Sequence, residues 1–320
     1  MPVTHKKGVL DLIGQTPLVK LNGLVPEGLH VYTKWEWLNP TLSMKDRIAL
    51  YMIEDAEKRG LLEKGMTIVA PSSGNTATSI AMVATVKGYK VVITVPDRTS
   101  LDKISYTKAF GAEVVLCRSS CHHDDSDHYI KKAAMIAYSR PRTYLLDQYN
   151  DLSNQHAHYY ITGPEIWEQT DGTITHLVVP AGSGGAICGV AKFLKCKNPT
   201  IKVISPDVKG SVYGFYKKYG FVSKMDGNTE IEGAGKKNIP VNMDIDLIDE
   251  FVPVSDEQAF SMCEVLAKQE GILVGGSSGA AFCAAQVVMK TMQSSDIMVV
   301  VFPDSGIKYL SKTANLINSN

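Results

Sequence analysis

Leu177-Val178-Val179-Pro180-Ala181-Gly182-Ser183-Gly184-Gly185 is the stretch that decides the fold. Its apolar start is typical of a buried strand, and the glycines that follow allow a tight turn into a helix expected at 185–195. Glycines also let backbone N–H groups approach an anion, and the helix dipole favours negative charge at that end. The stretch therefore predicts a phosphate site, although taken alone it fits an ordinary strand-to-helix turn equally well.

Two other phosphate-binding motifs are excluded by the residues that follow. The dinucleotide fingerprint G-x-G-x-x-G fails because Ile187 stands three positions after Gly184. A Walker loop fails because no Gly-Lys-Ser/Thr follows the glycines.

Short β-branched runs alternate with longer amphipathic stretches along the whole chain. The expected strands are 67–70, 90–95, 113–117, 175–180, 202–206 and 297–302. The expected helices are 46–60, 75–87, 101–110, 155–169, 185–195, 257–269 and 279–292. This alternation, over a chain long enough for two domains of about 150 residues each, predicts an α/β fold. We expect two three-layer α/β/α domains with mostly parallel sheets.

Composition restricts the classes of partner. Hydrophobic residues make up 44% of the chain, and basic and acidic residues balance at 33 each, so we expect neither nucleic acid nor an anionic membrane as partner. The first residues lack the apolar core of a signal peptide, and no apolar run approaches the roughly 18 residues of a membrane span. The six cysteines form no CxxC pair. These features predict a reduced, cytoplasmic protein.

Lys45 stands in the polar segment Asn39-Pro40-Thr41-Leu42-Ser43-Met44-Lys45-Asp46-Arg47. A lysine that forms an imine must be partly neutral, and burial or a neighbouring cation such as Arg47 favours that state. A single lysine at a helix start is more often a solvated surface charge. Lys45 is therefore a candidate only together with the other polar loops.

Two further polar loops precede expected helices. Ser72-Ser73-Gly74-Asn75-Thr76 offers hydroxyls, an amide and backbone N–H groups, which suit a carboxylate at a helix N-terminus. In Gly275-Gly276-Ser277-Ser278-Gly279 a neutral hydroxyl can meet a ring nitrogen without favouring its protonation, which suits elimination at a β-carbon. Either loop can equally be an ordinary N-cap. Together, however, a lysine, an anion cradle and two small polar loops are the parts that hold a phosphorylated aldehyde cofactor as a Schiff base.

The chain resembles the fold type II pyridoxal-phosphate enzymes, which are tryptophan synthase β-like, and specifically the cysteine synthase and cystathionine β-synthase group. The likeness begins at Ile13-Gly14-Gln15-Thr16-Pro17-Leu18-Val19 and ends at Pro303-Asp304-Ser305-Gly306-Ile307-Lys308-Tyr309-Leu310-Ser311. Asp147-Gln148-Tyr149 is more similar to cystathionine β-synthase, and Thr162-Gly163-Pro164-Glu165-Ile166-Trp167 to cysteine synthase.

The resemblance implies pyridoxal 5'-phosphate as cofactor and a role for each candidate residue. Lys45 is implied to be the Schiff-base lysine and the proton carrier at the substrate α-carbon. Asn75 is implied to face the cofactor's ring hydroxyl, and Ser277 its pyridine nitrogen. The implied phosphate cradle comprises Gly182, Ser183, Gly184 and Gly185. The implied substrate-binding residues are Ser72, Ser73, Thr76 and Gln148 at the α-carboxylate, Asn75, and Gly233 in a loop near the amine.

The resemblance also implies how the chain is divided. We expect an N-terminal segment, 1–45, that packs with the large domain. A smaller mobile domain, 46–150, is expected to close over the substrate, and 151–320 to form the large cofactor-binding domain. A homodimer is implied because the family is usually dimeric.

Four residues at three places in the chain depart from the usual family pattern. Thr41-Leu42 stands where Gly-Gly or a similar pair is usual, Ala77 replaces a glycine and Ala186 replaces a threonine. The first alanine suggests altered carboxylate binding. The second removes one hydroxyl from the phosphate cradle, so we expect weaker retention of the cofactor.

The implied reaction is β-replacement on L-serine or an activated derivative (O-acetyl- or O-phosphoserine, or cysteine). A thiol or sulfide would add to an α-aminoacrylate and give cysteine or a cystathionine-type thioether. Two alternatives stay open: elimination of the serine/threonine dehydratase type, and a low-activity paralogue that senses an amino acid or a partner's tail. The sequence leaves the leaving group and the nucleophile undetermined.

Several local predictions complete the sequence-based description. Surface loops are expected at 118–127 and 210–235. The run from Cys121 to His128 has ligand types that suit zinc, but it is contiguous and lacks a second cluster, so no metal is expected. Ser43 is expected to cap the 46–60 helix. The buried stripe of that helix is expected to comprise Ile48, Ala49, Met52, Ile53 and Ala56.

Overall fold

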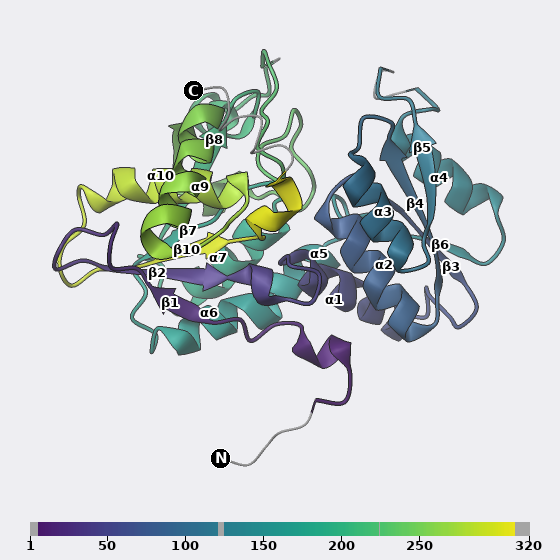
Figure 1. Cartoon of the computed structure of the whole chain (residues 1–320), viewed down its shortest axis with the longest axis horizontal. Coiled ribbons are helices and arrows are strands. Elements are labelled where there is room, and N and C mark those ends of the chain that lie inside the picture. Colours follow the sequence, from purple (N-terminus) through teal and green to yellow (C-terminus); the bar gives the residue numbers. More distant parts are fainter. Residues whose placement is uncertain (1–5, 121–124, 224, 311–320) are drawn as a thin grey trace. The chain divides into compact units, whose positions relative to one another are not determined.

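The computed structural model describes residues 6–120, 125–223 and 225–310 (Figure 1). The chain divides into two compact units. Unit 1 contains the chain up to Ile13 together with Asn39–Ser153, and unit 2 contains Gly14–Leu38 and Asn154–Asn320. The mobility predicted for region 46–150 stays a prediction.

Unit 1 is built on a four-stranded sheet in which every pairing is parallel. Its spatial order is β5-β4-β3-β6, and the strands are β3 (Thr67–Pro71), β4 (Lys90–Pro96), β5 (Glu113–Cys117) and β6 (Thr143–Leu145). Figure 1 shows α4 on one face of this sheet and the other helices of the unit on the opposite side. These helices are α1 (Lys45–Lys58), α2 (Asn75–Lys87), α3 (Leu101–Ala109) and α4 (Tyr129–Ser139), and the unit also contains η1 (Val9–Leu12).

Unit 2 is built on a six-stranded sheet of order β1-β2-β10-β7-β8-β9. The strands are β1 (Leu18–Lys20), β2 (His30–Trp35), β7 (His176–Val178), β8 (Lys202–Val208), β9 (Glu250–Val254) and β10 (Ile297–Phe302). The pairing of β1 with β2 is antiparallel and the remaining pairings are parallel. The α-helices are α5 (Ser153–Ala157), α6 (Gly163–Gln169), α7 (Gly185–Lys197), α8 (Tyr213–Tyr219), α9 (Asp256–Glu270) and α10 (Gly276–Met289). The short 3-10 helices are η2 (Glu36–Leu38), η4 (Ile245–Leu247) and η5 (Gly306–Tyr309), and η3 (His158–Thr162) is a π-helix.

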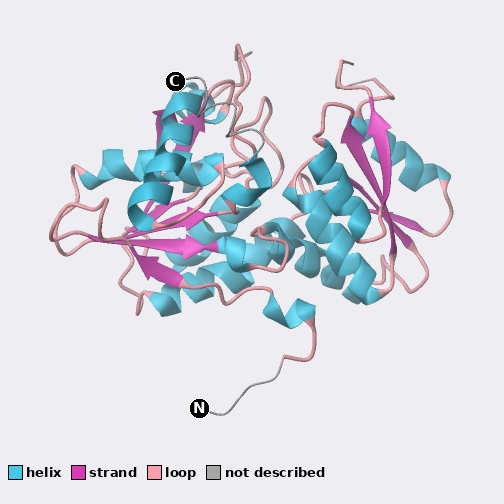
Figure 2. Ribbon diagram, viewed as in Figure 1, coloured by secondary structure: helices cyan, strands magenta, loops and turns pink. Residues whose placement is uncertain are grey.

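Helices cover both faces of the unit 2 sheet, with α9 and α10 on one face and α6 and α7 on the other (Figures 1 and 2). The sequence of β10, IMVVVF, explains this coverage, because five of its six residues are buried and both faces are apolar. A near-continuous apolar run is what a parallel strand between two helical layers requires. The predicted α/β class, with two three-layer domains, is confirmed.

Helix ends follow local chemistry. Helix α9 begins with a capping box, in which the Ser255 hydroxyl accepts from the amide of Gln258 and the Gln258 side chain accepts from the amide of Ser255. Helix α2 ends at Gly88, whose φ of 82° is the left-handed conformation that favours glycine. No helix in the described part of the chain is both long and apolar enough to cross a bilayer.

The buried stripe predicted for α1 is confirmed, whereas Ser43 lies one residue before the N-cap position and its Oγ accepts from the Lys45 amide. Ile48, Ala49, Met52, Ile53 and Ala56 are all buried. The N-cap residue of α1 is Met44, which lies in helical conformation and offers no side-chain acceptor.

The helix predicted at 155–169 is interrupted, because residues 158–162 form a π-helix between α5 and α6. Pro164 stands in the first turn of α6 and has no N–H to continue an α-helical ladder.

The predicted loop at 210–235 contains α8, so that prediction is wrong in part. Gly214 makes the helix possible, since a Cβ there would lie 2.1 Å from Asp207 Oδ2. Of the predicted loop at 118–127, residues 121–124 lie outside the described residues, as does that part of the zinc-like run.

Candidate active site

The start of α7 carries a set of buried backbone donors. Its N-cap is Gly184, with φ of 89°, and no side chain caps the helix. In the described structure the amides from Ser183 to Ile187 donate to no protein acceptor, although all five residues are buried. Buried amides in native proteins are almost always paired. This row of amides therefore fits an anionic ligand at the positive end of the helix dipole.

Close packing explains why glycines form this loop. A Cβ on Gly182 would lie 2.3 Å from the carbonyl oxygen of Gly233, and one on Gly185 would lie 2.0 Å from Asn154 Oδ1. A Cβ on Gly184 would lie 2.6 Å from the Asn242 carbonyl oxygen. The backbone at these three positions has no room for a side chain.

Side chains fix the loop from outside. Asn154 Nδ2 donates to Ser183 Oγ at 3.1 Å, so the hydroxyl proton of Ser183 remains available to another acceptor. The Tyr213 hydroxyl donates to the Gly182 carbonyl oxygen at 2.7 Å. The Gly235 amide donates to the Ala181 carbonyl oxygen at 2.8 Å, which holds the segment that contains Gly233 against the glycine loop.

Ser277 and Ser278 lie inside the first turn of α10, and Gly275 is the N-cap. Neither serine is therefore the N-cap of α10, which would be the ordinary structural role of a serine at a helix start. Both are buried, and Ser278 Oγ has no hydrogen-bond partner within the described residues. Asp304 packs against this helix start: a Cβ on Gly275 would lie 2.2 Å from its Oδ1, and Tyr309 donates to its Oδ2.

In unit 1, Lys45 is the first residue of α1 and is partly exposed. Its amide donates to Ser43 Oγ at 3.2 Å. Leu42, three residues earlier, has φ of 59°, which lies in the left-handed region. The strained residue turns the chain into α1 and leaves Lys45 at the helix start.

The second polar loop ends in α2, whose N-cap is Gly74 and again offers no side-chain cap. Thr76 Oγ1 donates to Gln148 Oε1 at 2.7 Å, so two predicted carboxylate-binding residues lie in direct contact. Ser72 is buried and its Oγ accepts from the Gly74 amide, whereas Ser73 is exposed and Asn75 is half-buried. The structure thus brings together the predicted site residues of unit 1 that surround the start of α2.

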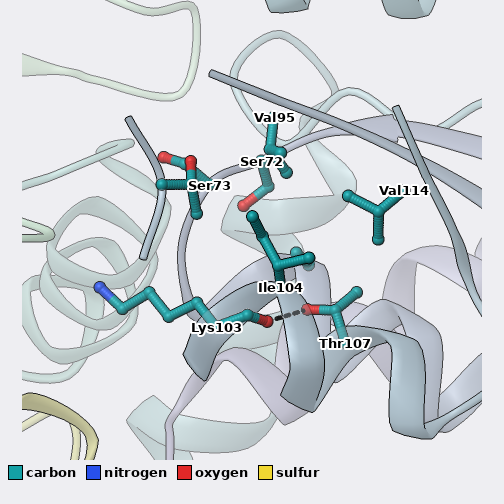
Figure 3. Close-up of a pocket in the computed structure, with 9 residues that line it drawn as sticks. Ser72, Ser73, Val95, Lys103, Ile104, Thr107 and Val114 are labelled. Atoms are coloured by element: carbon teal, nitrogen blue, oxygen red, sulfur yellow. Dashed lines mark hydrogen bonds between the residues drawn. The ribbon is translucent and has the colours of Figure 1, made fainter. Parts of the chain in front are cut away.

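A small pocket opens next to this loop, entirely within unit 1 (Figure 3). Its empty volume is about 180 Å³, including space open to solvent. The lining residues are Ser72, Ser73, Ala77, Val95, Thr99, Lys103, Ile104, Thr107 and Val114. Ala77, the departure from the family pattern noted above, therefore faces the space beside the predicted carboxylate site.

The family of pyridoxal-phosphate dependent enzymes matches residues 9–304 of this sequence. The chain belongs to this family. This membership confirms the predicted cofactor, pyridoxal phosphate, and the predicted class of enzyme.

Two curated relatives share one name. The chain is 40% identical over 318 residues to a cystathionine beta-synthase of Apis mellifera and 38% identical over 307 residues to that of Mus musculus. Each alignment covers 95% of this chain but only 60% and 54% of the relative, so the chain spans little more than half their length.

Solved structures match over nearly their full length. A hydrogen sulfide-producing enzyme from Fusobacterium nucleatum is 35% identical, with a TM-score of 0.88 over 97% of this chain and all of that one. O-ureido-L-serine synthase is 30% identical, with a TM-score of 0.89 over 97% of this chain and 95% of that one.

The residues present fit the cofactor. The five buried amides before and in the first turn of α7 match a phosphate group, which needs donors but no fixed positive side chain. The neutral hydroxyl of Ser277 suits a pyridine nitrogen that stays unprotonated.

Sequence reasoning missed the supporting residues Asn154, Tyr213 and Asn242. Tyr213 lies in the 210–235 stretch, which was predicted to be a loop. Their contacts with the glycine loop join residues that are far apart in sequence, so no local sequence pattern predicts them.

Proposed function

We propose that this chain catalyses β-replacement on L-serine or an activated L-serine derivative, with a thiol or sulfide as the incoming group. The observation that carries the proposal is the row of buried, unengaged amides at α7 in a chain of this family. The relatives named above, a cystathionine beta-synthase, a hydrogen sulfide-producing enzyme and O-ureido-L-serine synthase, support the reaction class.

The predicted site residues would hold the cofactor. Gly182, Ser183, Gly184 and Gly185 would bind its phosphate through backbone N–H groups and the Ser183 hydroxyl. Lys45 would bind its aldehyde carbon, Asn75 its ring hydroxyl and Ser277 its ring nitrogen. When bound, pyridoxal phosphate supplies an electron-withdrawing ring that makes the substrate's α-proton acidic.

The remaining steps use side chains of this chain. Ser72, Ser73 and Thr76, with Gln148, would hold the α-carboxylate, and Gly233 would lie near the amine. Lys45 Nζ would take the proton from the α-carbon and return one after the thiol has bonded to the β-carbon. The group on the β-carbon departs with its bonding electrons, so the exchange is redox-neutral.

The test is a matrix of substrates with product analysis by mass spectrometry. L-serine, O-acetyl-L-serine, O-phospho-L-serine and L-cysteine are each offered with sulfide, homocysteine or cysteine. We expect one combination to give a cysteine or thioether product. Its rate should exceed that of the Lys45→Ala variant by roughly a hundredfold or more.

Two results would replace the proposal. Pyruvate and ammonia without a sulfur product would assign the chain to β-elimination. Bound cofactor whose visible absorbance responds to none of the substrates would assign it to sensing. The predicted homodimer and cytoplasmic location stay predictions.

A further inference from the structure

A chain of buried hydroxyls joins the start of α1 to the start of α2 within unit 1. Thr41 Oγ1 donates to Asp46 Oδ1 and lies 3.1 Å from Ser79 Oγ. Ser79 Oγ in turn lies 3.0 Å from the carbonyl oxygen of Asn75. Thr41, Asp46 and Ser79 are all fully buried, so water does not compete for these bonds.

The backbone of Thr41 adds a second link to the same carboxylate. Its amide donates to Asp46 Oδ2 at 2.7 Å, so Thr41 contacts both oxygens of Asp46. Leu42, in its left-handed conformation, donates its amide to the Asn39 carbonyl oxygen at 2.8 Å and closes the turn. Lys45 directly precedes Asp46, the residue that Thr41 holds through two hydrogen bonds.

The number of protons limits the network. Three contacts link Asp46, Thr41, Ser79 and the Asn75 carbonyl, but the two hydroxyls carry only two protons. Thr41 gives its proton to the carboxylate, since a bond to a charged acceptor is stronger than one to a neutral acceptor. The Ser79 proton is then shared between Thr41 Oγ1 and the Asn75 carbonyl oxygen. Loss of the Thr41 hydroxyl would remove the side-chain bond to Asp46 and the contact between Thr41 and Ser79, and would leave Ser79 bonded to its own helix.

We propose that Thr41 is a positioning residue, whose hydroxyl holds the helix start that carries Lys45 in register with the helix start that carries Asn75. The proposal rests on the function proposed for Lys45 and Asn75. A glycine at position 41 would have no hydroxyl to form this link. The position thus takes part in site geometry in this chain through its side chain.

The test compares Thr41→Val, which keeps the shape and removes the hydroxyl, with Thr41→Ser, which keeps the hydroxyl. The matched control is Thr78→Val. Thr78 is also a buried threonine of unit 1, but its hydroxyl contacts Thr107 on α3 and not α1. Each purified protein is titrated with pyridoxal phosphate after removal of cofactor, and kcat and KM are then measured on the loaded enzyme.

We expect Thr41→Val to bind the cofactor about tenfold more weakly and to lose about tenfold in kcat, as one charge-assisted hydrogen bond implies. KM for the amino acid should stay within about twofold, because the Thr76–Gln148 contact is untouched. Thr41→Ser should stay within about threefold of the wild type, and Thr78→Val should lower only the melting temperature, by about 2–4 °C per kcal/mol lost.

Wild-type affinity and kcat in Thr41→Val would overturn the proposal, as would a Thr41→Ser variant as impaired as Thr41→Val. A loss of activity matched by Thr78→Val would also overturn it, since that would reflect general destabilisation. Failure of the proposed function looks different, because then the wild type itself forms no sulfur product.

Discussion

The loop before α7 and the loop before α2 share one plan, a parallel strand followed by a short polar turn and a helix without a side-chain cap. They differ in what fills the turn. At α7, Cβ atoms on Gly182 and Gly185 would clash at 2.3 Å and 2.0 Å, whereas at α2 a Cβ on Gly74 would meet no atom within 4 Å. The first loop presents backbone to a ligand, and the second presents side chains.

The two loops therefore differ in what they can recognise in a ligand. A backbone cradle recognises an anion by its charge and size, whatever the rest of the ligand is, which suits a phosphate. Side chains held by partners, as Thr76 is held by Gln148, can discriminate among substrates. Substitutions at the two loops should therefore fail in different measurements.

The largest effect is expected at Lys45, whose amine neither loop can replace. Lys45→Ala should lower kcat by about a thousandfold, within the range for loss of a general acid-base group. The control is Lys58→Ala, at the exposed end of the same helix, which should stay within about twofold. Steady-state rates check both, and a Lys45→Ala enzyme with a tenth of the normal kcat would contradict the assignment.

The comparison itself is tested by alanine at one glycine in each loop. Gly182→Ala should lower the free energy of unfolding by about 1–3 kcal/mol, because the added methyl group meets backbone rather than a movable side chain. Cofactor affinity should fall about tenfold or more. Gly74→Ala should leave cofactor affinity within about twofold, since its φ of −123° suits alanine and the space is open. Equal losses of cofactor affinity in the two variants would remove the distinction.

A smaller effect is expected at Thr76. Thr76→Val removes the donor to Gln148, and the loss of about 1 kcal/mol should appear as a rise in KM for the amino acid of about fivefold. Cofactor affinity should be unchanged, and Thr76→Ser should restore KM. If kcat or cofactor affinity fell while KM stayed unchanged, Thr76 would belong with the cofactor residues.

The smallest effect concerns the strand that leads to each loop. Burial lowers the pKa of His176 in β7 below its usual 6.5, whereas β3 carries no titratable residue. The unfolded chain therefore binds more protons than the folded one as pH falls below 6.5, and folding stability decreases there. In denaturant titrations from pH 7.5 to pH 5, at roughly half-unit steps, His176→Gln should flatten this decline by a fraction of a kcal/mol. A steeper loss of folding stability in the variant than in the wild type would contradict the lowered pKa of His176.

Much of this fold was predictable because its parallel strands are short apolar runs between amphipathic helices. The bounds of α2 and β5 were predicted to the residue, and the glycine loop was recognised from its composition. Helix α4 was missed although Ala133, Ile136 and Ala137 form its buried stripe. The π-helix at 158–162 was missed because it depends on Pro164 and on packing against α7 rather than on hydrophobic period.

The candidate site was predictable in part for a similar reason. Residues that touch a ligand cluster in short polar loops and are visible in sequence. The contacts that hold these residues in place join distant parts of the sequence: Gln148 lies 72 positions from Thr76, and Tyr213 lies 31 from Gly182. Neither contact follows from a local pattern, because only the folded backbone brings these residues together.

The central claim, that Lys45 carries the cofactor, is tested most directly by reducing the holoenzyme with borohydride, digesting it and mapping the modified peptide by mass spectrometry. The account predicts one phosphopyridoxyl group, on Lys45, and none on that peptide in Lys45→Ala. A label on another lysine, such as Lys103 beside the Ser72–Ser73 pocket, or no covalent label on a protein that retains cofactor, would contradict it.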